Sequence, residues 1–422
     1  MNRKIVKNTF FLSASQILAR GIGFLYTIFL ARFLGVYNFG IYSFTLAFIS
    51  PFMQVADFGV ERYVLRDLSR EPQKAMNYLS NLLPLRLFLA VGALLLAITT
   101  SVILRQPLAQ IGYLVAFGLM LIPYSLLFLF LSYFNSQEKM HYYALVNVAQ
   151  ILLTAVLGVI FALLKGGLLA ILSAYPLANL SILLYFVFNC QRWQIPIGWK
   201  IDWKFWKKSL AESWVFAVLL IMAVFYLRLA TIMTGLLKGP EATGLYSSAA
   251  KFIEAMILIP QSLALALFPL SSKLILEDKS KLKAIYKKGL TVLFLFSLPF
   301  SLVMILGPKI IISLAYGQEY LSAVPVFRIL GIVVIFFFVN SLAGNIIQNS
   351  DKVKRFLPFA LVNFLIQLVL TLILIPRYSI LGAAWAVVGG EVAGLVINNW
   401  FVYEILTERN LLNKDISRKA AI

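Results

Sequence analysis

Four basic residues lie inside apolar runs of twenty or more residues, namely Arg20, Arg86, Arg228 and Lys251. An Arg or Lys at the centre of a membrane helix costs about 2.5–3.5 kcal/mol on insertion scales, so such a side chain faces a bundle interior or a wet cavity. A cavity lined with fixed positive charge attracts anions. We therefore predict that these four residues line a cationic lumen that binds an anionic substrate on its way through a membrane. Each has a structural alternative, either an ion pair or snorkelling to the headgroups.

Two acidic residues in similar segments could couple transport to an ion gradient. Glu391 lies within Val-Val-Gly-Gly-Glu-Val-Ala-Gly, where glycines permit close helix approach and a lone carboxyl could titrate or bind Na⁺. Glu254 follows Lys251 by one helical turn, so these two could instead neutralise each other. A salt bridge from Glu391 to one of the arginines is the other structural reading. Coupling to H⁺ or Na⁺ through Glu391 or Glu254 is thus a hypothesis, and no bound cofactor or metal is expected.

The composition indicates an integral membrane protein. Hydrophobic residues make up 61% of the 422 and charged residues 13%, and the mean hydropathy is +0.89. The net charge of +20 could suggest nucleic-acid binding, but the cations lie in short loops between apolar runs, so no nucleic-acid partner is expected. A single cysteine, Cys190, excludes an intrachain disulfide. With one histidine, His141, no Cys/His zinc site is expected.

Apolar segments long enough to cross a bilayer, about 20 residues each, predict an all-α polytopic protein with twelve spans. The expected spans are 8–33, 39–60, 77–104, 108–134, 142–164, 167–189, 210–236, 243–270, 286–312, 323–348, 355–375 and 379–406. With the N-terminus in the cytoplasm, the inner segments hold 26 Lys and Arg residues and the outer loops hold four. This imbalance predicts that both termini are cytoplasmic and that the protein lies in the plasma (inner) membrane. The first span reads as retained, not as a cleaved signal peptide.

The two halves of the chain repeat each other. Residues 40–49 match 244–253 at five of ten positions, and Gly35 aligns with Gly239 at the same offset of 204. Further on, Asn135-Ser136 and 144–147 recur as Asn349-Ser350 and 360–363. An offset of six spans keeps orientation, so this predicts a parallel repeat of two six-helix lobes, 1–198 and 210–422. Between them, 199–209 is expected to form a cytoplasmic amphipathic linker at the headgroups, although an ordinary basic loop would also explain it.

Two segments carry a family resemblance. Residues 34–43 (LGVYNFGIYS) and 316–330 (YGQEYLSAVPVFRIL) resemble patterns of the polysaccharide-biosynthesis flippases, the Wzx-like branch of the multidrug/oligosaccharidyl-lipid/polysaccharide exporter superfamily. The resemblance implies a MATE-like transporter architecture with alternating access. It implies a substrate, an undecaprenyl-diphosphate-linked oligosaccharide, that moves from the cytoplasmic to the outer leaflet for O-antigen, capsule or exopolysaccharide export. The implied partners are this glycan, the lipid bilayer and other polysaccharide assembly proteins.

Other functions fit the sequence less well. A drug antiporter of the same fold would need acids to dominate its cavity, whereas cations outnumber acids in these spans. A lipid II flippase would carry two further spans. A polymerase or glycosyltransferase would carry a large external loop for its chemistry, and the outer loops here are short, so the protein is not expected to be an enzyme. A non-transporting scaffold would not require charges inside its spans.

Overall fold

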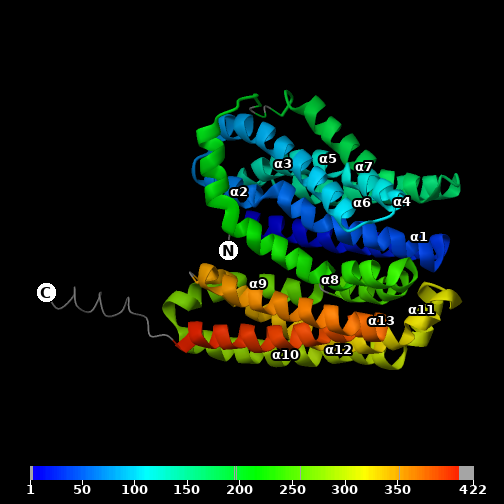
Figure 1. The fold of residues 1–422 in the computed structure, drawn as a ribbon. Coiled ribbons are helices and arrows are strands. Elements are labelled where there is room, and N and C mark those ends of the chain that lie inside the picture. Colours follow the sequence, from blue (N-terminus) through cyan, green and yellow to red (C-terminus); the bar gives the residue numbers. More distant parts are fainter. Residues whose placement is uncertain (1–2, 194, 196, 257, 351, 408–422) are drawn as a thin grey trace. The chain divides into compact units, whose positions relative to one another are not determined.

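The computed structural model describes residues 3–193, 195, 197–256, 258–350 and 352–407, which form helices and connecting turns without a strand (Figure 1). In a bilayer core, helices satisfy every backbone polar group within one segment, which is why these apolar runs are helical. The helices are α1 (Arg3–Asp57), α2 (Val60–Arg70), η1 (Pro72–Lys74), α3 (Ala75–Ile103), α4 (Leu108–Gly118), α5 (Leu121–Ser136), α6 (Met140–Leu163), α7 (Gly167–Asn189), α8 (Trp203–Met256), α9 (Leu258–Glu277), α10 (Lys279–Leu306), α11 (Pro308–Ala315), η2 (Gln318–Ala323), α12 (Val324–Asn349) and α13 (Val353–Thr407). The four counted cations between 409 and 419 lie outside the described residues.

Three helices are far longer than one span requires, and each contains a break. Of the described residues, nine helical segments are long and apolar enough to cross a membrane, and three of these run for 54 to 57 residues. Helix α1 breaks at Gly35, α8 breaks at Gly239 and α13 breaks at Ser379. Because about 20 residues suffice for one crossing, each broken helix accommodates two spans. The arrangement is therefore compatible with the twelve predicted spans.

The breaks in α1 and α8 are the same structure at equivalent positions of the repeat. Gly35 has φ 68° and ψ 173°, and Gly239 has φ 82° and ψ −174°. Both lie in a region that is open to glycine and strained for residues with a Cβ. The internal repeat predicted from the sequence is thus visible in the backbone as two matching turns, 204 residues apart.

Five residues after each turn glycine, the two repeats pack on each other reciprocally. A Cβ placed on Gly40 would lie 1.8 Å from the carbonyl oxygen of Pro240, and a Cβ placed on Gly244 would lie 2.1 Å from the carbonyl oxygen of Val36. Val36 and Pro240 are themselves repeat equivalents, so each glycine contacts the same position of the other repeat. This contact requires two glycines because the backbones meet where side chains would otherwise stand. We call it the glycine junction.

The second repeated motif also has the same local structure in both halves. Ser136 donates to the carbonyl oxygen of Tyr133, three residues before it, over 2.7 Å. Ser350 donates to the carbonyl oxygen of Ile347, again three residues before it, over 2.8 Å. Each serine therefore closes the end of a helix, α5 or α12, in the same way.

The chain divides into two compact units, which we describe separately. The first runs to Ser248 and includes Ala315–Tyr320, and the second holds the described remainder. In the first unit, α1 packs on α3 and α6, and α6 packs on α7; in the second, α12 packs on α9, α10 and α13. These bounds differ from the predicted lobes 1–198 and 210–422, and that division stays a prediction.

The predicted linker 199–209 overlaps the start of α8, which begins at Trp203. Trp199 and Trp203 are exposed, as expected for indoles at an interface. Trp206 is instead buried, and its indole nitrogen donates to the carbonyl oxygen of Asn81 over 2.8 Å. The segment is therefore held to α3 by one tryptophan while two others remain available for the headgroup region.

Alanine at either junction glycine should destabilise the protein. Gly40→Ala and Gly244→Ala each force the two backbones apart, and overpacking of this kind costs about 1–3 kcal/mol. Thermal unfolding of the purified chain in nanodiscs measures the loss. Gly92→Ala is the matched control, since a Cβ there meets nothing within 4 Å and alanine favours a helix. A Gly40→Ala protein that unfolds at the wild-type temperature would contradict this packing.

Candidate functional site

The segment 315–320 completes the glycine junction within the first unit. The Tyr320 hydroxyl donates to the carbonyl oxygen of Ala31 over 2.8 Å, and Arg32 Nε donates to the carbonyl oxygen of Ala315 over 2.7 Å. The Phe39 ring lies against Tyr316 and Tyr320, with ring centroids 6.3 and 6.1 Å apart. The two segments that carry the family resemblance, 34–43 and 316–330, therefore meet at this point of the structure.

Arg86, one of the four predicted lumen cations, is fully buried in α3. Its guanidinium forms an ion pair with Asp57 and donates to the carbonyl oxygen of Ser125 over 2.7 Å. Taking a guanidinium out of water is costly unless a carboxylate and further hydrogen bonds compensate it, and both are present here. In this structure Arg86 therefore ties α3 to α5 and to the end of α1; its contact with substrate stays a prediction.

Asp57 organises the turn that follows α1. Its carboxylate accepts hydrogen bonds from the backbone nitrogens of Gly59 and Glu61, at 3.1 and 3.2 Å. The chain passes through two left-handed residues, Phe58 and Gly59, before α2 begins. Helix α2 then buries Val60, Val64 and two other residues on one face, which is the spacing of an amphipathic helix. Asp57 therefore caps α2 and also pairs with Arg86.

Arg20 and Arg228 are both half-buried in long apolar helices, Arg20 in α1 and Arg228 in the first part of α8. Both side chains make interactions within the structure. Their shared role in a cationic lumen stays a prediction, but neither is sealed in a core as Arg86 is.

Lys251 and Glu254 are partners. Lys251 Nζ lies 2.8 Å from the Glu254 carboxylate, one turn along α8, and both side chains are partly buried. The sequence allowed either mutual neutralisation or separate roles, and the structure has the ion pair. A pair of this kind is favoured by the spacing of one turn along a single helix.

Glu391 is a buried acid of the second unit, with 4% of its surface exposed. Asn340 of α12 donates to the Glu391 carboxylate over 2.8 Å and to its backbone carbonyl oxygen over 3.1 Å. Asn363 lies beside the same turn of α13: a Cβ on Gly394 would be 3.1 Å from the Asn363 amide nitrogen and 3.5 Å from that of Asn340. The structure thus brings together three polar side chains from α12 and from both arms of α13.

The charged residues of the site can be recognised in the sequence, but most of their partners cannot. The pairing of Asp57 with Arg86 joins two spans, and such a pairing cannot be inferred from spacing along one helix. Asn340 was not singled out, although it is a polar residue within an otherwise apolar run. Asn363 was seen only as part of the repeat. An amide inside a predicted span is a usable signal, since polar groups in a bilayer must find partners there.

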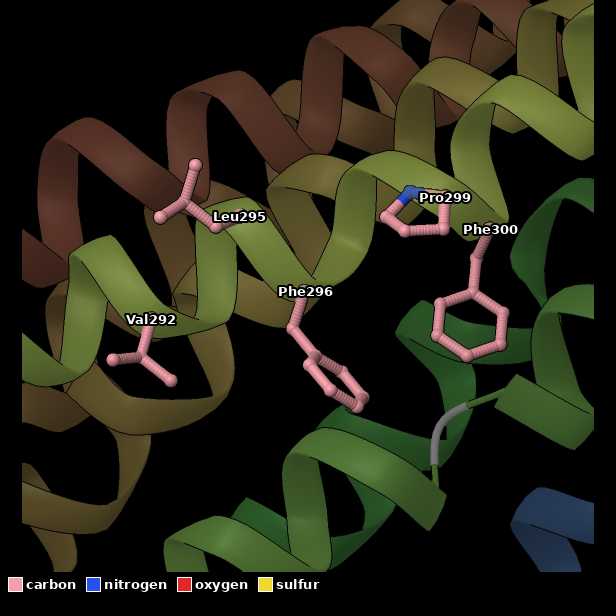
Figure 2. A pocket seen from close by; sticks show the side chains of 5 residues that line it. All are labelled: Val292, Leu295, Phe296, Pro299 and Phe300. Carbon is pink, nitrogen blue, oxygen red and sulfur yellow. The ribbon is translucent and has the colours of Figure 1, made fainter.

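A groove of about 470 Å³ lies on α10 in the second unit and is lined by apolar side chains alone. Figure 2 shows Phe296 and Phe300 projecting to the same side, with Val292 one turn before them and Pro299 beside Phe300. Such a surface offers no hydrogen bond to a diphosphate or a sugar. The charged and polar side chains described above do not line it.

Comparison with known proteins identifies relatives. The profile of the family described as "Polysaccharide biosynthesis protein" matches residues 5–275, and the MatE profile matches 215–373. The Shigella flexneri protein named "Putative O-antigen transporter" is 26% identical over 381 residues, which covers 85% of this chain and 88% of that protein. The uncharacterized membrane protein MJ1068 of Methanocaldococcus jannaschii is 31% identical over 157 residues, 36% of this chain and 30% of that protein.

Solved structures share the fold. The lipid II flippase MurJ, in an inward closed conformation, matches with a TM-score of 0.74 at 15% identity over 93% of this chain and 87% of that one. An inward-facing multidrug resistance MATE family transporter matches with a TM-score of 0.73 at 14% identity, over 91% and 94% of the two chains. At these identities the likeness concerns the fold alone. The predicted fold class, an all-α polytopic membrane protein of MATE-like transporter architecture, is confirmed.

Removing the carboxylate that pairs with Arg86 should be strongly destabilising. Asp57→Asn leaves a fully buried guanidinium uncompensated, and breaking a buried pair in this way costs about 3–5 kcal/mol. The double variant Asp57→Asn/Arg86→Met should recover part of that loss, which thermal unfolding in nanodiscs measures. Glu212→Gln is the control, because it breaks the exposed Arg66–Glu212 pair, whose loss should cost about 1 kcal/mol or less. Equal effects of Asp57→Asn and Glu212→Gln would contradict the structural role given to Arg86.

Proposed function

Because the chain belongs to the polysaccharide biosynthesis protein family, we propose that it is a flippase for a polyprenyl-diphosphate-linked oligosaccharide. The observation that carries the proposal is the family match over 5–275, together with 85% coverage by an O-antigen transporter relative. The substrate is assembled with its diphosphate and sugars on one side of the membrane and its polyprenyl chain in lipid. Flipping moves the polar part to the outer leaflet and breaks no covalent bond, so the protein acts as a transporter and not as an enzyme.

The physical support for an anionic substrate is the placement of Arg20 and Arg228. Each is a half-buried guanidinium within an apolar helix of the first unit. A diphosphate is a dense anion, and a guanidinium offers it two parallel hydrogen bonds. Several contacts of moderate strength along the path allow the substrate to be released, whereas one very tight binding site would hold it. In the second unit, Lys251 is already paired with Glu254, so we give it a secondary role in substrate binding.

The proposed location is the plasma (inner) membrane, with both termini in the cytoplasm. The excess of Lys and Arg in alternate loops supports this orientation. It puts the turns at Gly35 and Gly239 at the outer surface, and Asp57 with α2 at the cytoplasmic surface. The glycine junction then closes the path at its outer end, and the substrate enters from the cytoplasm. Alternating access requires the junction to part when the substrate is released outside.

Proteins with the alternative functions share this fold, so the identity of the transported substrate distinguishes the functions. MATE drug transporters and a lipid II flippase are both among the structural neighbours, at 14–15% identity. The family match and the intramembrane arginines favour a lipid-linked glycan. A drug antiporter would move cationic compounds against a gradient of H⁺ or Na⁺ and would be indifferent to the loss of Arg20.

Translocation in proteoliposomes tests the function. The purified chain should move a fluorescent undecaprenyl-diphosphate oligosaccharide between leaflets, followed as the fraction that an impermeant quencher reaches. Arg20→Gln and Arg228→Gln should each slow the initial rate by about 10- to 100-fold, because a hydrogen bond to a charged group contributes about 1.5–3 kcal/mol. Arg20→Lys keeps the charge and should lie between wild type and Arg20→Gln.

Arg105→Gln is the matched control for this assay, since it removes an equal charge from an exposed turn after α3. It should flip at the wild-type rate. Wild-type protein that flips no lipid-linked glycan but exchanges a cationic drug would overturn the proposal in favour of the antiporter. If both Arg20→Gln and Arg228→Gln flip the glycan at the wild-type rate, the flippase function stands. The two arginines would then not contact the substrate.

Cysteine labelling tests the proposed orientation. Cysteines replacing the exposed Arg105 or Lys165 should react with an impermeant maleimide in intact cells, and cysteines replacing Lys74 or Lys139 only after permeabilisation. The native background is low because Cys190 is buried and burial raises the pKa of its thiol. Little thiolate is present at neutral pH, and its labelling increases as the pH rises. If Lys139→Cys reacts in intact cells and Lys165→Cys does not, the protein has the opposite orientation to the one proposed.

A further inference from the structure

The first turns of α8 expose a face on which one tryptophan and three lysines stand together. Trp203 is 72% exposed, and Lys204, Lys207 and Lys208 are exposed as well. Residues four apart in a helix project from the same side, so Trp203 neighbours Lys207 and Lys204 neighbours Lys208. The opposite side is packed inward through the buried Trp206. The helix therefore has a fixed inner side and an outer side that combines an indole with positive charge.

The inner side holds this outer face in position. The Trp206 indole donates to the carbonyl oxygen of Asn81 over 2.8 Å, and the Phe205 ring packs edge-on against Tyr78, with ring centroids 5.1 Å apart. Both partners belong to α3. Trp203 in turn lies against Trp206, with ring centroids 5.0 Å apart. The exposed indole is thus oriented before any ligand arrives, which lowers the entropic cost of binding.

The stretch that precedes α8 extends the same surface. The backbone nitrogen of Lys200 donates to the carbonyl oxygen of Ser80 over 3.0 Å. A Cβ on Gly198 would lie 2.5 Å from the Ser80 hydroxyl oxygen, so the backbone of this stretch lies directly against α3. The side chains of Trp199 and Ile201 are nonetheless 65% and 53% exposed. A backbone that α3 holds in place therefore presents apolar groups outward beside the lysines.

The positive charge of this surface is only partly neutralised within the protein. Residues 199–209 include four lysines and one acid, Asp202. The Asp202 carboxylate accepts hydrogen bonds from two backbone nitrogens, at 3.0 and 3.1 Å, and so caps α8. Glu212 lies 3.9 Å from Lys208 but 2.6 Å from Arg66 of α2. One acid is thus engaged by the helix end and the other is shared with α2, and the surface keeps a net positive charge.

From this arrangement we propose that the surface binds the phosphate headgroup of an anionic phospholipid. Its members, which we call the lysine–tryptophan face, are Trp199, Trp203, Lys204, Lys207 and Lys208. A cluster of lysines on an amphipathic helix beside a membrane span attracts anionic lipid, and indole rings favour the level of the headgroups. Helix α8 continues from this face into an apolar segment long enough to cross a membrane, so the face lies where that span leaves the bilayer. An acidic protein would match the lysines alone, whereas a lipid also accommodates the exposed indoles.

Phospholipid binding stands independently of the proposed flippase function. With the orientation proposed above, the lipid belongs to the cytoplasmic leaflet. The segment joins the two halves of the sequence, and a lipid bound to it would hold the start of α8 at the membrane surface. Because the same segment is bonded to α3, the bound lipid should stabilise the folded protein as a ligand does.

Titration of the purified full chain, in a neutral detergent, with short-chain phosphatidylglycerol or phosphatidylcholine tests the site. Native mass spectrometry gives the half-saturating lipid concentration, and thermal unfolding gives the stabilisation. Phosphatidylglycerol should bind saturably and raise the unfolding temperature. Phosphatidylcholine, whose headgroup has no net charge, should require at least a tenfold higher concentration. Added salt should weaken the binding of phosphatidylglycerol, because exposed charges are screened.

Substitutions on the lysine–tryptophan face locate the lipid. Lys204→Gln, Lys207→Gln and Lys208→Gln should each raise the half-saturating concentration of phosphatidylglycerol about fivefold, since a basic residue near anionic lipid contributes about 1 kcal/mol. The triple variant should raise it about 100-fold. Trp203→Ala should also weaken binding, and Trp203→Phe should retain most of it. Without lipid, the lysine variants should unfold at the wild-type temperature, because these side chains are exposed.

A second triple variant is the matched control. Lys281→Gln/Lys287→Gln/Lys288→Gln removes the same charge from exposed positions in the first turns of α10, where the sequence has no tryptophan. It should bind phosphatidylglycerol like wild type. Equal losses in the two triple variants would reflect net charge alone and would overturn the site.

Other outcomes also decide the proposal. Equal binding of the two phospholipids by wild type would overturn it and leave the lysines for an acidic protein partner. Wild-type binding by the triple variant of the lysine–tryptophan face would overturn it as well. Displacement of bound phosphatidylglycerol by an equimolar undecaprenyl-diphosphate oligosaccharide would assign the face to that substrate instead. Phosphatidylglycerol binding in a protein that flips no glycan would refute the flippase proposal and leave the site intact.

Discussion

The reciprocal packing of Gly40 and Gly244 is the constraint on which the rest of the first unit depends. Each glycine meets a backbone carbonyl of the other repeat at a distance that excludes any side chain. The matching turns at Gly35 and Gly239 direct the following helices into this contact, and Tyr316 and Tyr320 pack around it. The two segments that resemble the family, 34–43 and 316–330, meet at this junction. Their residues are therefore constrained by packing as well as by any contact with substrate.

Charge in the apolar part of the protein occurs in two distinct forms. Arg86 is fully buried and is held by Asp57 and the Ser125 carbonyl, while its Nε has no hydrogen-bond partner among the described residues. Arg20 and Arg228 are half-buried, which is compatible with the contact to an anionic substrate that we propose for them. A charge that a transporter uses must be reachable by its substrate, and Arg86 is fully buried in this structure. The acid Glu391 is buried in the second unit and accepts a hydrogen bond from Asn340.

The sequence was sufficient for the fold class, the repeat and the family, and insufficient for the pairing of side chains. Twenty-residue apolar runs and the glycine offset of 204 are local signals, and both have direct counterparts in the broken helices. The Lys251–Glu254 pair was also foreseeable, because it lies along one helix. The Arg86–Asp57 pair, the Asn340–Glu391 bond and the burial of Trp206 join different helices. Such contacts depend on helix rotation and crossing, which a single sequence without related chains does not specify.

The central claim is that the glycine junction is the closed outer end of a path that must open for a lipid-linked glycan to leave. Spin labels on Tyr37→Cys and Glu241→Cys, both exposed next to the junction, in a Cys190→Ala background report the distance across it by double electron–electron resonance. Without substrate, one short distance should dominate. With undecaprenyl-diphosphate oligosaccharide in nanodiscs, a second, longer population should appear. A single unchanged distance in protein that flips the glycan would contradict the account, because release would then occur without parting the repeats.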